Sequence, residues 1–157
     1  MAIITLNNNS LSSVTSLPAA ISTGKVLNVY NHVHTSSDST NSTSFVASSS
    51  TITLTPVSSS SKFLLLYNAV GETGGGGARP EFTFYRDSTN IGTGNNSSIV
   101  RDQDTTNINF NYSMQKLDSP STASEITYKM YYRCDGSYTT YANANNNAHL
   151  TIFEIQG

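Results

Sequence analysis

Apolar and small polar residues alternate through most of the chain after position 24. The clearest case is residues 107–114, where every even position is apolar and every odd position is Asn or Ser. A period of two residues is typical of a β-strand with one buried face. The pattern predicts strands near residues 25–35, 45–46, 51–55, 62–70, 81–85, 107–114, 125–134 and 149–155.

The predicted strands differ in which positions they bury. Residues 63–67 are apolar at every position, as expected for a central strand of a sandwich. In the first strand Leu27, Val29 and Val33 share one face, which the pattern predicts to be the buried one. The Phe, Tyr and Met positions of 107–114 and 125–132 are expected either in the core or at a symmetry axis between subunits.

Turn-forming residues separate the predicted strands and set the fold class. Runs rich in Gly, Asn, Asp and Ser lie between them, and no helical periodicity is visible outside the N-terminal segment. Short strands without helices indicate an antiparallel sandwich or barrel. Eight or more strands fit an all-β sandwich of the jelly-roll type. A seven-strand immunoglobulin sandwich fits less well, because the chain has one Cys and no Trp.

Residues 1–24 are predicted to form an extended N-terminal arm, ahead of a jelly-roll domain over residues 25–157. The arm is rich in Ser and Asn, which disfavour an independent helix. Its own domain, a sister subunit or another protein can hold such a segment, and we expect one of the last two. The expected anchoring side chains are Ile3, Ile4, Leu6, Leu11, Val14 and Leu17.

Composition narrows the function classes. The net charge is −2, and charged residues make up only 11% of the 157 residues, whereas Ser, Thr and Asn together make 62. Scattered basic residues argue against nucleic-acid binding, which needs a basic patch. The longest apolar run, residues 63–67, is far short of a membrane span, and no signal peptide is visible. A single Cys cannot form an internal disulfide, so we expect folding in a reducing cytosol.

No motif points to catalysis, a cofactor or a metal. Residues 74–77 are glycine-rich, but no Lys follows, so they indicate a strand connection rather than a phosphate loop. Asp102 and Asp104 resemble the start of a calcium loop, yet the later ligand positions do not fit. They are also the only close acidic pair for glycoside hydrolysis. A solvated loop is the expectation there, and the chain is not expected to be an enzyme.

The spacing of His32 and His34 places both imidazoles on one face of a strand. In a trimer with this strand at the axis, six imidazoles could surround one transition metal. The plainer interpretation is a pair of surface histidines, and we expect no metal. Cys134 is expected to be a free, partly buried thiol.

Tyrosines cluster near the turn at residues 135–137. Tyr138 and Tyr141 are candidate receptor-loop residues, because aromatic rings beside Asn and Ser can bind sugars or proteins. The alternative, which we favour, is a hairpin whose rings pack on their neighbours.

Four segments, in the same order, resemble a domain common in structural proteins of tailed phages. The likeness covers about residues 25–157. It rests on STSFV at 42–46 with ITLTP at 52–56 and SSSKFLL at 59–65, on RDSTNIG at 86–92, on LDSP at 117–120 with ITYK at 126–129, and on LTIFEI at 150–155.

The resemblance implies a virion protein, assembled in the host cytoplasm, with a trimeric jelly roll of the tumour-necrosis-factor-like kind. An arm of 24 residues reaches at most about 80 Å, so we expect a capsid decoration or head knob, or a fibre component, rather than a long fibre. The partners implied are two sister copies and other virion proteins. The alternative function is a tail-fibre knob that binds a host-surface glycan. Head and tail locations stay open.

Overall fold

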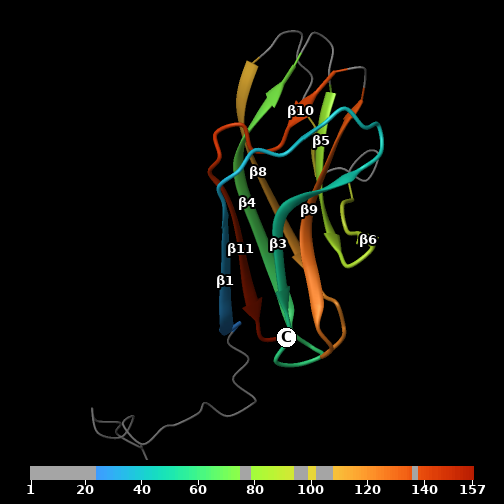
Figure 1. The fold of residues 1–157 in the computed structure, drawn as a ribbon. Coiled ribbons are helices and arrows are strands. Elements are labelled where there is room, and N and C mark those ends of the chain that lie inside the picture. Colours follow the sequence, from blue (N-terminus) through green and yellow to red (C-terminus); the bar gives the residue numbers. More distant parts are fainter. Residues whose placement is uncertain (1–23, 75–78, 94–98, 102–107, 136–137) are drawn as a thin grey trace, which may run out of the picture.

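The computed structural model describes residues 24–74, 79–93, 99–101, 108–135 and 138–157. These residues form strands and turns, with no helix among them (Figure 1). The strands are β1 (Val26–His34), β2 (Ser39–Thr40), β3 (Val46–Leu54), β4 (Lys62–Thr73), β5 (Arg79–Arg86), β6 (Thr89–Asn90), β7 (Val100–Arg101), β8 (Ile108–Asp118), β9 (Ile126–Asp135), β10 (Thr140–Tyr141) and β11 (Ala148–Ile155).

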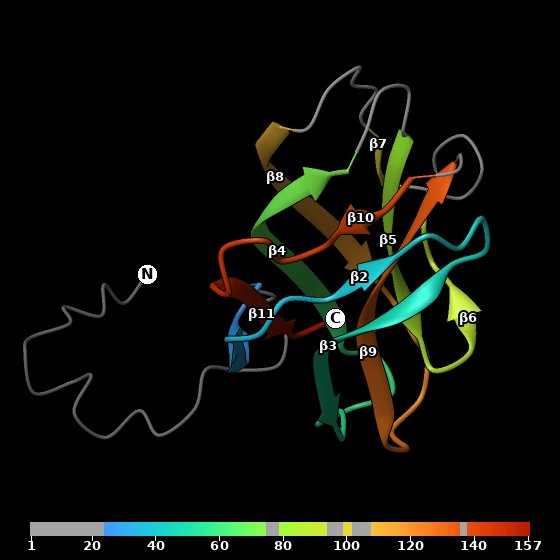
Figure 2. The ribbon, with the colours of Figure 1, turned by 45° about the horizontal axis from the view of Figure 1, so that its top comes forward.

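Two antiparallel sheets pack face to face (Figures 1 and 2). Sheet A has the order β1-β11-β4-β10-β2, and β8 also pairs with β4. Sheet B has the order β3-β9-β5-β6, and β7 also pairs with β5. The long strands from β3 onward alternate between the two sheets along the chain. The predicted all-β antiparallel sandwich is therefore confirmed.

The core lies between the sheets and follows the predicted alternation. In β8, Tyr112 and Met114 point inward while Asn111 and Ser113 face solvent. Rings from both sheets meet there: the centroids of Phe82 and Tyr112 are 4.1 Å apart and the rings are stacked. Apart from Tyr131, the aromatic and Met positions of β8 and β9 with described burial therefore serve the core. The main buried residues are Ile52, Leu54, Phe63, Leu65, Tyr67, Phe82, Phe84, Tyr112, Met114, Ile126, Tyr128, Met130, Tyr132, Leu150 and Ile152.

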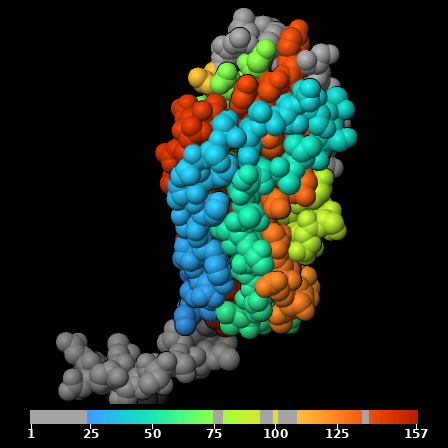
Figure 3. Space-filling view, viewed as in Figure 1, coloured from blue at the N-terminus to red at the C-terminus, as the bar shows by residue number. Residues whose placement is uncertain are grey.

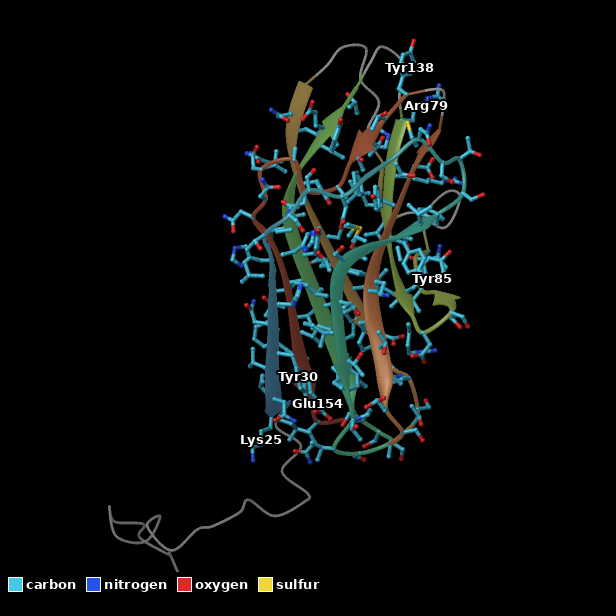
Figure 4. The ribbon with its side chains drawn as sticks, in the orientation of Figure 1. Lys25, Tyr30, Arg79, Tyr85, Tyr138 and Glu154 are labelled. Carbon is cyan, nitrogen blue, oxygen red and sulfur yellow. The ribbon has the colours of Figure 1, made fainter. Side chains whose placement is uncertain are left out.

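The predicted burial of β1 is wrong for Val29 and Val33, whereas Leu27 is half-buried. Val29 and Val33 are 57% and 43% exposed, whereas Tyr30 lies on the opposite, inward side (Figure 4). The physical reason is Glu154, which is fully buried on the inner face of β11. A buried carboxylate needs hydrogen-bond donors, and Asn28 and Tyr30 supply them from the inner face of β1. The register that satisfies Glu154 turns the valines outward.

The same register determines where the side chains of His32 and His34 lie. His34 is buried, the His32 and His34 rings are stacked with centroids 6.3 Å apart, and the Nε2 atoms of both are buried. Nε2 of His34 lies 3.3 Å from an Asp38 carboxylate oxygen, but without hydrogen-bond geometry. The expected pair of surface histidines is therefore wrong for His34, which is buried, whereas His32 is half-buried.

β1 and β3 come from different sheets and lie side by side along one flank of the sandwich (Figure 3). Their long axes run from the end that carries Lys25 toward the end that carries Tyr138 (Figure 4). The attachment point of the arm and the tyrosine-bearing loop therefore lie at opposite ends of the domain.

Candidate functional site

A row of apolar side chains crosses the outer face of sheet A. Val29 pairs with Phe153, Phe153 with Leu64, and Leu64 with Leu117, so the four residues stand side by side on four adjacent strands. Val29 and Leu117, at the two ends, are 57% and 55% exposed. Phe153 and Leu64 are half-buried. We call these four residues the apolar row.

Other apolar side chains extend this surface toward the end where the arm joins. Val26 is exposed, and its partner Ile155 is half-buried. On the other side of the row, Asn31, Thr151 and Gln115 are uncharged polar residues, and the half-buried Leu66 stands between Thr151 and Gln115. Contiguous apolar patches of this kind on a folded protein mark interaction surfaces.

Further along the outer face of sheet A lies an open hollow of about 380 Å³. Asn68, Asn111, Ser113, Asn147 and His149 contribute to its wall. Nε2 of His149 lies 3.0 Å from the Asn147 side-chain oxygen. The lining residues include one histidine, His149, and no carboxylate. The hollow therefore offers no pair of side chains for acid–base catalysis.

A second candidate surface lies on the outer face of sheet B. The rings of Tyr85 and Tyr131 are stacked with centroids 3.8 Å apart, and Phe45 meets Tyr85 edge-on at 6.4 Å. All three residues are half-buried, so each keeps some contact with solvent. We call these three residues the aromatic platform. Stacked, partly exposed rings are suited to binding a flat apolar face of a ligand.

Arg133 holds the aromatic platform in place. Its guanidinium lies over the Phe45 ring, 4.7 Å from the centroid. It also donates two hydrogen bonds, of 2.9 and 2.7 Å, to one carboxylate oxygen of the fully buried Glu81, and a third to the carbonyl of Thr43. The buried ion pair fixes the guanidinium, and the guanidinium in turn fixes Phe45.

A further ion pair joins the two sheets. Arg86 and Tyr128 both donate to the same carboxylate oxygen of Asp118, at 2.7 and 2.8 Å. Burial, together with the nearby Asp118 carboxylate, raises the pKa of Tyr128 well above its ordinary value. The phenol therefore stays protonated and acts as a hydrogen-bond donor, which is a structural role.

The two predicted receptor tyrosines, Tyr138 and Tyr141, differ in burial. Tyr138 is 40% exposed, whereas Tyr141 is half-buried in β10, opposite Ser39 and Glu72. Tyr85 was not a predicted site residue. Its stacking on Tyr131 follows from the register of β5 and β9, in which Thr83 faces Tyr131 and Tyr85 faces Lys129.

Several predicted residues lie outside the described part of the chain. They are Ile3, Ile4, Leu6, Leu11, Val14 and Leu17 of the arm, and Asp102 and Asp104 of the predicted loop.

Metal-ligating and nucleophilic side chains are dispersed among the described residues. No group of three or more His, Cys, Asp or Glu side chains within the described ranges is placed to hold a metal ion. Cys134 is a free thiol and is fully buried rather than partly buried. Within the same ranges, no helix has the length and apolar character needed to cross a membrane.

Comparisons with known proteins give likenesses to solved structures but no match in sequence. No family model matches the chain, and no curated protein matches it. A chain in the structure of infectious bursal disease virus, Gx strain, superposes with a TM-score of 0.37 and 13% sequence identity, over 82% of this chain and 36% of that one. This chain thus spans about a third of the other's length. A TM-score of this size does not establish a shared fold, so the architecture rests on the chain's own strand pairing.

Proposed function

We propose that the chain is a structural protein of a tailed-phage virion, anchored by the arm at residues 1–24. In this proposal it is a trimeric capsid decoration or head knob, or a fibre component, and it has no catalytic activity. The observation that carries the proposal is the apolar row, which lies on an exposed sheet face at the arm-bearing end of the domain. Exposed apolar surface of this kind is typical of a protein that docks on another.

The rest of the surface supports the same role. Outward positions of β3 and β8 are mostly Ser, Thr and Asn, and charged residues make up only 11% of the chain. Faces of short uncharged side chains bring little like-charge repulsion when many copies are crowded together. A virion component present in many copies meets that condition.

The jelly-roll and trimer parts of the proposal have separate support. The long strands have the order β1-β11-β4-β8 in one sheet and β3-β9-β5 in the other. From β3 onward, each long strand lies in the opposite sheet from the one before it. Closed three-fold symmetry would also hide apolar surface that a monomer exposes. Light scattering on the purified chain should give three times the chain mass of 16.9 kDa. A single-chain mass would contradict the trimer.

The decisive experiment is the abundance of the chain in purified virions, measured against the major capsid protein. Abundance close to that of the capsid protein would indicate a decoration or head knob. A few copies per particle would indicate a tail or fibre component. Absence from the particles would overturn the virion proposal.

Anchoring by the arm is tested in the same particles. A variant that consists of residues 24–157 should fold but be missing from virions. A full-length Tyr138→Ala variant is the matched control, because its change lies at the opposite end (Figure 4), and it should be incorporated normally. Normal incorporation of the truncated variant would contradict the anchoring role.

A second candidate function is a knob that binds a host-surface glycan. The aromatic platform favours it, because half-buried aromatic rings offer an apolar surface on which a sugar ring can pack. Tyr131→Ala should lower adsorption of virions to host cells without changing assembly. Tyr138→Ala and Tyr141→Ala test the loop that the sequence indicated. Unchanged adsorption in all three variants would remove this candidate.

A further inference from the structure

The arm joins the domain beside the apolar surface of sheet A. Gly24 lies against Ile155: a Cβ at Gly24 would be 4.0 Å from Cγ2 of that residue. The carbonyl of Lys25 accepts a hydrogen bond of 2.9 Å from the amide of Gln156. These contacts fix the point where residues 1–23 join the domain. On β11, Ile155 is two residues from Phe153, a member of the apolar row.

The length of the arm is sufficient to cover the row. The row lies roughly 10 Å along β1 from Val26, and its four strands span about 14 Å. The segment from Leu17 to Gly24 can extend over about 23 Å. Leu17 can therefore reach most of the row, and the residues before it can cross the sheet.

The composition of the arm matches the row. Residues 1–23 contain no charged side chain, and neither does the row, so contact between them would bury no side-chain charge. Leu11, Val14 and Leu17 recur at every third position. In a polyproline II segment, which has three residues per turn, that interval is about 9 Å, which is close to two strand spacings, and the three side chains share one face. Successive apolar side chains of the arm can thus stand over alternate strands.

We propose that, in the unattached chain, residues 1–23 lie across the apolar row of their own sheet A. The tether favours the chain's own arm over any other occupant, because a short linker gives an effective concentration of the order of millimolar. The contact removes two apolar surfaces from water at once. It also implies that attachment begins with release of the arm from the row, a consequence that rests on the proposed function.

Cysteine pairs in the purified full-length chain test the contact. Leu117→Cys is combined with Leu11→Cys in one variant and with Val14→Cys in another, and both are oxidised under native conditions. Cys134 is fully buried and should not react. In the control, Thr53→Cys, on the exposed outer face of sheet B, replaces Leu117→Cys. We expect an intramolecular disulfide at least tenfold more abundant in one of the Leu117 pairs than in its control.

Each other outcome overturns the proposal. Disulfides between chains, increasing with protein concentration, would assign the row to a second copy. Disulfide yields equal to those of the controls would place the arm elsewhere. Because no virion is involved, these results are independent of whether the chain is found in particles, so failure of the proposed function is distinguished from failure of the contact.

Dye binding gives a second measurement. Removal of residues 1–23 should raise the fluorescence of an apolar dye such as ANS severalfold, because the row becomes uncovered. Val29→Asn with Leu117→Asn in the truncated chain should abolish the increase. Equal dye binding by the full-length and truncated chains would contradict the proposal.

Discussion

Glu154 is the residue whose chemistry most constrains the edge of the sandwich. Its carboxylate accepts hydrogen bonds from Asn28 at 2.8 Å, from the amide of Val57 at 2.6 Å, and from Tyr30 at 3.4 Å. Burial opposes ionisation, but these hydrogen bonds outweigh it and hold the pKa of Glu154 below its ordinary value. The carboxylate therefore connects β1, β11 and the turn after β3 in its charged form.

Glu154→Gln should lower the free energy of unfolding at neutral pH by about 2 kcal/mol, since hydrogen bonds to a charged group are lost. A carboxyl group with a depressed folded-state pKa stabilises the protein above its unfolded-state pKa, near 4.3, and loses that effect as the pH falls through the folded-state value. The difference between wild type and variant should therefore narrow below about pH 4. Urea unfolding at several pH values measures it.

The control for this prediction is Glu125→Gln, because Glu125 is exposed. It should change stability by less than about 0.5 kcal/mol. A Glu154→Gln variant that showed a constant deficit from pH 7 to pH 3 would contradict the role given to the charged carboxylate.

Gly71 of β4 has no side chain, and the ring of Phe110 on the neighbouring strand β8 occupies the space beside it. Gly71 pairs with Phe110, and a Cβ at Gly71 would lie 2.5 Å from the Phe110 ring. Gly71→Ala should destabilise the protein by about 1–3 kcal/mol, the usual cost of overpacking. Phe110→Leu in the same chain should recover part of the loss. Gly24→Ala, whose Cβ would make an ordinary contact, is the control, and thermal unfolding is the measurement.

At the scale of elements, alternation predicted the long strands but not every buried face. β4 and β8 follow the predicted segments, and the two segments predicted at 45–46 and 51–55 are one strand, β3, with an irregular register between Ala47 and Thr51. β1 has apolar residues on one face and Tyr and His on the other. On pattern alone, either face could be buried. The choice depends on the buried carboxylate of Glu154, far away in sequence, which needs hydrogen-bond donors from the face that carries Asn28 and Tyr30.

A matched pair of substitutions tests the orientation of β1. Val33→Thr should change the free energy of unfolding by less than about 0.5 kcal/mol, because Val33 faces solvent. Ile152→Thr, on the inner face of β11, should cost about 2–3 kcal/mol, because it removes buried carbon and buries a hydroxyl. Equal losses in denaturant titrations would mean that the valine face of β1 is buried.

Short strands and cross-strand sites were beyond the reach of the sequence. β2, β6, β7 and β10 have two residues each, too few to show a period. The aromatic platform is likewise invisible, because Tyr85 and Tyr131 meet only through the register of β5 and β9. The sequence could suggest Tyr138 and Tyr141 because they are neighbours in the chain, whereas diagonal neighbours on a sheet face have no fixed sequence spacing.

At the scale of the whole molecule, the described core is complete without the arm. Every buried side chain of the main core lies between residues 52 and 152. Residues 24–157 should therefore unfold cooperatively, with a thermal midpoint within about 6 °C of that of the full-length chain. Calorimetry on both proteins makes the comparison. A truncated chain without a cooperative transition would show that the arm belongs to the fold.

The position of β1 at the edge of sheet A has a mechanical consequence. Lys25, just before β1, lies at the end of the domain opposite Tyr138 (Figure 4), so a load applied between these two ends pulls β1 along its own axis. Hydrogen bonds between antiparallel strands stand perpendicular to that axis, and those along the β1–β11 pairing from Val26 to His34 would resist such a load together, in shear. A force perpendicular to the strands that drew Lys25 away from Gln156 would instead break the same hydrogen bonds one after another, in an unzipping geometry.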